Sequence, residues 1–178
     1  MSDYKAFLFE LAQKRYDSEH ELWNRSNTLI SIYIGGLAVF LGFLIDFELT
    51  PASSTTLEYT SYGLLIAAVL CVLFILYQVF RFISGHRYEY IPGPDSMTKY
   101  VKELEEYYAG ADMADKSAAI RDDMINSVID KYNSAVSHNF NENVDRLGRL
   151  VVIGRTIVVV FCLALALFVL KNLPKIIG

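Results

Sequence analysis

Three long apolar blocks run through the chain, separated by polar segments. They extend from about residue 27 to 45, from 62 to 83 and from 150 to 170, and none contains an acidic residue. A helix needs roughly 20 apolar residues to cross the hydrocarbon core of a bilayer. Aromatic, Lys or Arg residues of the kind found at headgroup level flank each block. The pattern therefore predicts three transmembrane helices, over 26–47, 62–84 and 150–171.

The polar segments are also predicted to be helical. Residues 1–25 carry an imperfect apolar stripe that is typical of an amphipathic helix. After the second block, Pro-Gly-Pro at 92–94 stops any helix, because proline lacks an N–H and restricts the residue before it. Asp95 or Ser96 can then cap a helix over 96–109, which Gly110 would end.

A longer helix is predicted to start near Asp112 or Ala114. Its apolar positions recur at helical spacing and continue into the third block, which would give one helix of about 57 residues, roughly 85 Å long. The stretch 137–143 (SHNFNEN) is the expected place for a break, because Asn and Ser side chains compete for backbone hydrogen bonds. The predicted fold class is an all-α membrane protein with a helical cytosolic insert between the second and third spans.

The distribution of Lys and Arg predicts the orientation of the spans. Residues 1–25 hold four Lys or Arg residues, whereas the stretch from 46 to 61 holds none. Because cytoplasmic loops are enriched in these residues, the N-terminus and a helical domain over 85–149 are expected in the cytosol. An external loop over 48–61 and a short external tail over 172–178 complete the arrangement. Lys171 and Lys175 depart from the rule, but their stems can reach the outer interface.

Composition and motifs exclude several functions. Hydrophobic residues make up 53% of the chain, collected in the three blocks. The first 26 residues carry nine charges and no apolar run, so a cleavable signal peptide is not expected. The sequence holds no phosphate-binding glycine loop, nucleophile elbow or HExxH motif. We expect no enzyme activity, no cofactor and no metal site, with both cysteines acting as small hydrophobes.

Polar residues before the third block form the main candidate site. Asn139, Asn143 and Arg146 are spaced i, i+4, i+7 and share one helix face. This face could bind an anionic ligand or line a vestibule, or the asparagines could tie neighbouring helices together. Anionic lipid headgroups could satisfy the same basic residues. The candidates for ligand binding or gating, all near the inner membrane level, are Arg81, Arg87, Tyr88, Asn139, Asn143, Arg146 and Arg149.

A second set of candidates lies within the spans. Small residues at three- and four-residue spacing let helices approach closely, and the same stripe could line a narrow pore. Polar residues inside a span mark a partner, a cavity or a pathway. The pore or helix-packing candidates are Ser31, Gly35, Ala38, Gly42, Gln78 and Arg155. The apolar stripe of the long helix is wider than one helix pair requires, so we expect a homo-oligomer, with a tetramer as the working number.

The layout resembles that of small bacterial membrane effectors of anti-phage defence systems. The similarity rests on LWNRSNTLI at 22–30, two close spans, a cytosolic helical insert and YNSAVSHNFNENVDRLGRL at 132–150. It is similar to the two-span SLATT effectors and to the membrane effector of the Hailong system, although it adds a C-terminal span. Of the site residues, only Asn139, Asn143 and Arg146 carry over.

The resemblance implies a gated membrane pore or ion channel in the bacterial inner membrane that arrests infected cells by abortive infection. A partner nucleotidyltransferase would make the nucleotide or short single-stranded DNA that controls it. Two alternatives stay open. The chain could be a non-conducting scaffold or sensor that recruits a partner through its cytosolic helical domain, or it could be a subunit of a larger membrane enzyme.

Overall fold

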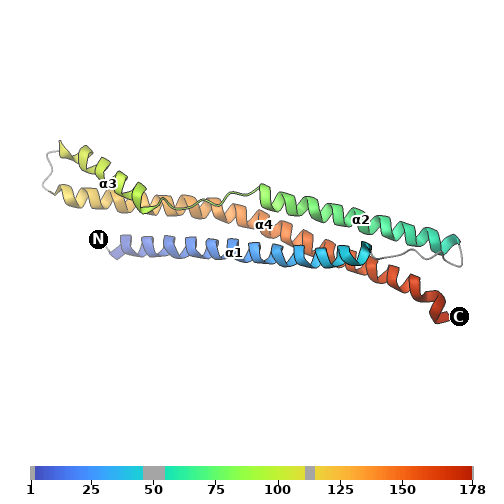
Figure 1. Cartoon of the computed structure of the whole chain (residues 1–178). Coiled ribbons are helices and arrows are strands. Elements are labelled where there is room, and N and C mark those ends of the chain that lie inside the picture. Colours follow the sequence, from blue (N-terminus) through green and yellow to red (C-terminus); the bar gives the residue numbers. More distant parts are fainter. Residues whose placement is uncertain (1–2, 46–54, 111–114, 178) are drawn as a thin grey trace. The chain divides into compact units, whose positions relative to one another are not determined.

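The described part of the chain is mostly helical. The computed structural model describes residues 3–45, 55–110 and 115–177. These residues form four helices and no strand, which confirms the all-α prediction (Figure 1). The helices are α1 (Asp3–Ile45), α2 (Thr55–Ser84), α3 (Pro94–Ala109) and α4 (Lys116–Ile177).

The helices divide between two compact units. The first, here the polar unit, comprises Met1–Asn24 and Arg87–Val144, and the second, the apolar unit, comprises Arg25–His86 and Asp145–Gly178. The polar unit carries nine Lys or Arg residues against sixteen Asp or Glu residues, whereas the apolar unit carries seven against four. The net charges are therefore −7 and +3. Both α1 and α4 contribute residues to each unit.

Two described helices are long and apolar enough to cross a membrane. They are Glu58–Ser84 within α2 and Lys116–Asn172 within α4. Only 22% and 28% of their most apolar windows are buried, whereas the core helix of a soluble protein is mostly buried. The spans predicted over 62–84 and 150–171 lie within these two helices.

The first predicted span differs from the other two. It lies on α1, which is not one of the two helices that meet the length and hydropathy requirements. The segments predicted as 1–25 and 26–47 share this one helix, and residues 46 and 47 lie outside the described residues. The loop predicted over 48–61 ends earlier than expected, because α2 begins at Thr55. Its residues 48–54 lie outside the described residues.

Local chemistry explains where α3 and α4 begin. Gly93 is the residue before α3, in an extended conformation, and Pro94 opens the helix without a side-chain cap. The cap predicted at Asp95 or Ser96 is therefore wrong, whereas the predicted end at Gly110 is confirmed. The start of α4 is set by Asp115, whose carboxylate accepts a hydrogen bond from the Ala118 N–H at 2.9 Å. Asp112 and Ala114, the predicted starts, lie outside the described residues.

The break predicted at 137–143 is wrong, because α4 runs unbroken from Lys116 to Ile177. The prediction assumed that Asn side chains there compete with the helix for its own backbone groups. In the structure, the side-chain amides of Asn139 and Asn143 bond to Glu89 and Glu19, which are distant in sequence. The backbone of α4 therefore keeps its hydrogen bonds.

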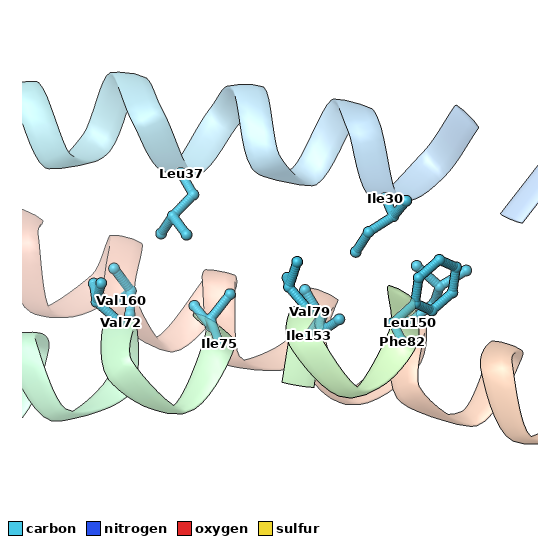
Figure 2. Close-up of a cluster of buried hydrophobic side chains, with 9 residues drawn as sticks. All are labelled: Ile30, Leu37, Val72, Ile75, Val79, Phe82, Leu150, Ile153 and Val160. Atoms are coloured by element: carbon cyan, nitrogen blue, oxygen red, sulfur yellow. The ribbon is translucent and has the colours of Figure 1, made fainter. Parts of the chain in front are cut away.

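The core of the apolar unit is a continuous apolar seam between α1, α2 and α4. Figure 2 shows the side chains of the three helices meeting along it. Its buried members are Ile30, Leu37, Val72, Ile75, Val79, Phe82, Leu150, Ile153 and Val160. The side chain of Tyr33 packs over Gly154, where a Cβ atom would lie 3.0 Å from the Tyr33 hydroxyl. Side chains of all three helices thus pack together in this seam.

Candidate functional site

The three residues predicted to share a face of α4 are all buried. Asn139, Asn143 and Arg146 are 0%, 2% and 2% exposed. Such burial is rare for Asn and Arg unless hydrogen-bond partners are present. Asn139 and Asn143 belong to the polar unit and Arg146 to the apolar unit, so each is described within its own unit.

Asn139 holds the connector between α2 and α3. Its side-chain oxygen accepts a hydrogen bond from the Glu89 N–H at 2.8 Å, and its side-chain nitrogen donates to the Glu89 carbonyl at 3.0 Å. The amide thus pairs with both backbone groups of one residue, as a neighbouring strand would. On the preceding position, His138 Nε2 lies 2.8 Å from the Arg87 carbonyl. These bonds fix the extended stretch 87–89 on α4.

Asn143 ties α4 to α1 within the polar unit. Its side-chain nitrogen donates to the Glu19 carbonyl at 2.9 Å and to the Glu19 carboxylate at 2.8 Å. One residue therefore receives both bonds from the amide, one at the backbone and one at a charged group. Hydrogen bonds to charged groups are stronger than neutral ones.

Arg146 lies inside the apolar unit between α1 and α2. It donates a short hydrogen bond to the Asn27 side-chain oxygen. Its guanidinium carbon lies 4.3 Å from the centre of the Phe82 ring, which is a cation–π contact. The arginine therefore connects three helices at one level, next to the core residues at that end of the seam.

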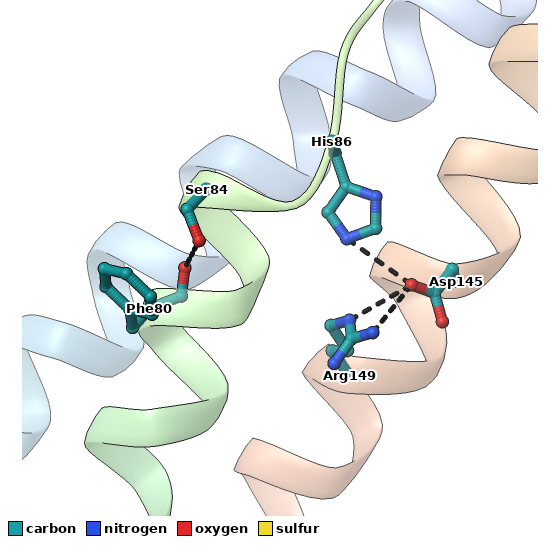
Figure 3. A network of polar contacts seen from close by, with 5 residues as sticks. All are labelled: Phe80, Ser84, His86, Asp145 and Arg149. Atoms are coloured by element: carbon teal, nitrogen blue, oxygen red, sulfur yellow. Dashed lines mark hydrogen bonds and ion pairs between the residues drawn. The ribbon is translucent and has the colours of Figure 1, made fainter.

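A charged network involving Asp145 lies beside Arg146 in sequence. Figure 3 shows the side chains of His86 and Arg149 converging on the Asp145 carboxylate. Arg149 donates from Nε and Nη2 at 3.1 and 2.9 Å, and His86 Nε2 lies 3.5 Å from the same oxygen. The side chain of His86 is only 5% exposed, whereas that of Asp145 is 55% exposed. One carboxylate thus links the end of α2 to α4.

Tyr88 occupies the centre of an aromatic cluster in the polar unit. Its ring lies 5.1 Å from those of Trp23 and Tyr90 and 5.3 Å from that of His20, measured between centroids. Burial, followed by the nearby Tyr16, raises the pKa of the Tyr88 hydroxyl well above its ordinary value. The ring of Tyr88, a predicted candidate for ligand binding or gating, is therefore packed against the protein's own rings.

The remaining basic candidates are less buried than Arg146. Arg81, Arg87 and Arg155 are exposed, and Arg149 is half-buried against Asp145. Exposed guanidinium groups can reach an anion or a lipid headgroup without any rearrangement. The structure thus separates the sequence-predicted basic residues into three exposed members, the half-buried Arg149 and the buried Arg146.

The small residues predicted on the first span point away from the core. Ser31, Gly35, Ala38 and Gly42 are all exposed, whereas Ile30 and Leu37 on the other side of α1 are buried. A Cβ atom built on Gly35 or Gly42 would meet nothing within 4 Å. These four residues do not pack against the described helices of this chain. Gln78 on α2 is half-buried.

Sequence reasoning missed the partners of the candidate residues. Glu19, Asn27, His86, Glu89 and Asp145 all take part in the contacts described above. Only the pairing of Asp145 with Arg149 has a local signal, because the two are four residues apart on a helix.

The described helices define an all-α protein with two helices that could cross a membrane. No protein-family model, curated protein or solved structure matches the chain.

Proposed function

We propose that the chain is the subunit of a gated membrane pore or ion channel in the bacterial inner membrane, acting as an effector of an anti-phage, abortive-infection system. A nucleotide or short single-stranded DNA, made by a partner nucleotidyltransferase, controls it near the inner membrane face. The observation that carries the proposal is the outward-facing stripe of small residues on α1, from Ser31 to Gly42.

This stripe has no packing role within the described chain. Ser31, Gly35, Ala38 and Gly42 are exposed, and the hydroxyl of Ser31 bonds back to the Asn27 carbonyl at 2.9 Å. Lipid tails gain little from small residues, whereas helices of other copies approach closely along them. Small side chains also leave room for water and ions. The stripe therefore suits either the contact between subunits or the lining of a pore.

We place the pore between copies because apolar side chains pack together between the helices of one chain. Nine buried apolar side chains close the space between α1, α2 and α4. An apolar seam of this kind offers an ion no polar group to replace its water. We therefore propose that the conducting path forms between several subunits of a homo-oligomer. We place three spans per subunit, over 26–47, 62–84 and 150–171, with a cytoplasmic N-terminus.

The signal is proposed to act through α4. This helix contributes to both units, and its residues Asn139, Asn143 and Arg146 each hold a different segment. The exposed arginines Arg81 and Arg87 are accessible to an anionic signal without any rearrangement of the chain. The three buried residues become accessible only if their own contacts open. Binding that favours the opened arrangement would shift the population toward it.

The experiment is ion flux through proteoliposomes that contain the purified full chain. Gly35→Leu places a large side chain on the outward stripe, and we expect it to change the flux at least several-fold. Ile32→Leu is the matched control, because Ile32 is exposed on the same helix but outside the stripe and keeps its volume. Sealed vesicles across several lipid compositions and candidate signals would reject the channel.

A scaffold or sensor is the second candidate function. It is favoured by two hollows in the polar unit, of about 370 and 380 Å³, which could receive a partner. It predicts that expression of the full chain recruits a partner without loss of membrane potential.

A further inference from the structure

Arg155 is a charged residue within the third proposed span, and its side chain is exposed on α4. The apolar residues around it on the helix are exposed as well, namely Val151, Val152, Val158 and Val159. An arginine inside a span is costly, and it marks a partner, a cavity or a pathway. The surroundings of Arg155 therefore bear on what the proposed pore carries.

Helix geometry turns Arg155 away from the core of the apolar unit. It lies two residues after Ile153 and five residues before Val160, both of which are buried in the seam. At 3.6 residues per turn, these offsets place Arg155 on the opposite side of α4. Gly148 and Cys162, seven residues before and after it, are exposed on the same side. A Cβ atom on Gly148 would meet nothing within 4 Å. This side of α4 thus carries one cation among small and apolar side chains.

The described chain offers Arg155 no carboxylate at its own level. Its guanidinium makes no hydrogen bond or ion pair with any residue that the structure describes. Within the described ranges, the carboxylates of the apolar unit are Glu58 and Asp145. Asp145 is roughly 15 Å away along α4 and already binds Arg149. Glu58 lies in the first turn of α2, roughly 21 Å before Val72, the first seam residue of that helix. Neither carboxylate is within reach of Arg155.

Neighbouring copies bring only the same described side chains to this level. The subunits of a closed ring are related by rotation, so each copy places its helices at the same depth in the membrane. Exposure to lipid tails would leave the charge of Arg155 without water and without a counter-ion, which is costly. A water-filled path between copies keeps the guanidinium hydrated. An anion in that path is then the group that neutralises it.

We propose that Arg155 of every subunit faces the conducting path and makes it select small inorganic anions over cations. Rings of arginine or lysine side chains are the means by which a pore attracts anions. The inference rests on the proposed function, because it names the kind of ion that the pore carries. The stripe on α1 then supplies the contact between subunits, one of the two roles proposed for it.

Chemical labelling of Cys162 gives one test, because this cysteine is exposed on the same side of α4 as Arg155. In the full chain with Cys71→Ala, an anionic, water-soluble methanethiosulfonate applied to a planar bilayer should place a negative charge at Cys162 and lower the preference for chloride. The matched control combines Cys71→Ala with Cys162→Ala and should not respond to the reagent. An unchanged current in both variants overturns the inference, because this side of α4 then does not face the path. The test keeps Arg155 in place and so does not depend on how its variants assemble.

Reversal potentials test the selectivity itself. The full purified chain is recorded in a planar bilayer under an asymmetric KCl gradient, and we expect the permeability to chloride to exceed that to potassium several-fold. Arg155→Gln removes the charge and should abolish this preference, whereas Arg155→Lys keeps the charge and should retain it. Current steps that favour potassium, or an equal preference in Arg155→Gln and the parent, overturn the inference and leave the channel standing. A bilayer that incorporates the protein without steps refutes the channel itself, and the inference with it.

Discussion

Removal of the Asn139 side-chain amide should release the connector from α4. The amide makes two hydrogen bonds to the backbone of Glu89, at 2.8 and 3.0 Å, and is 0% exposed. Each such bond contributes about 1 kcal/mol net, and more when its loss leaves a buried group without a partner. We therefore expect Asn139→Ala to lower the free energy of local opening by about 2 kcal/mol. This corresponds to a roughly 30-fold larger equilibrium constant for local opening.

Hydrogen exchange at the Glu89 amide reads this change directly, because that N–H donates to Asn139. The measurement uses the full chain in lipid nanodiscs, with exchange followed on a peptide that contains residue 89. Asn133→Ala is the matched control, since Asn133 is an exposed asparagine on the same helix, and exchange should stay as in the parent. Equal Glu89 exchange in Asn139→Ala and the parent, with helix content unchanged, would refute the reasoning.

Three further outcomes are expected. Tyr88 should stay neutral in an alkaline absorbance titration while exposed tyrosines ionise, because burial raises its pKa. The stability that the neutral hydroxyl contributes should be lost as the pH rises through that raised pKa. Tyr88→Phe should remove only the late part of the titration. Arg146→Ala should lower the free energy of unfolding in detergent by about 2–3 kcal/mol, because the buried hydrogen bond to Asn27 and the contact with Phe82 are lost. An unchanged melting curve would contradict this. Gly154→Ala should lower the melting temperature, because the new Cβ would lie 3.0 Å from the Tyr33 hydroxyl. Adding Tyr33→Phe should restore part of the lost stability by removing that hydroxyl. A melting temperature as low in the double variant as in Gly154→Ala alone would contradict this.

The apolar blocks and the turn chemistry could be predicted because their signals are local. Two predicted spans lie within α2 and α4, since a run of apolar residues needs no partner to be recognised. The end of α3 at Gly110 follows from the same kind of local signal. The break at 137–143 was wrong because the fate of Asn139 and Asn143 depends on residues 50 and 124 positions away. A helical period gives the face on which a residue lies, but not its partner.

The same limit applies to the small residues on α1. Their spacing predicts a common face, and the sequence cannot say whether that face turns toward the core or away from it. The structure places Gly35 and Gly42 outside and Leu37 inside. This orientation changes the interpretation, because packing within the described chain no longer accounts for the stripe. Contact with other subunits and pore lining are the two roles proposed for it.

Single-channel recording in a planar bilayer tests the central claim most directly. The full purified chain should give discrete current steps, because a pore formed between a fixed number of subunits has a defined conductance. Gly35→Leu should change the size of the step, and Ile32→Leu should leave it as in the parent. A bilayer that incorporates the protein yet shows no steps, with and without nucleotide and short single-stranded DNA, would contradict the account.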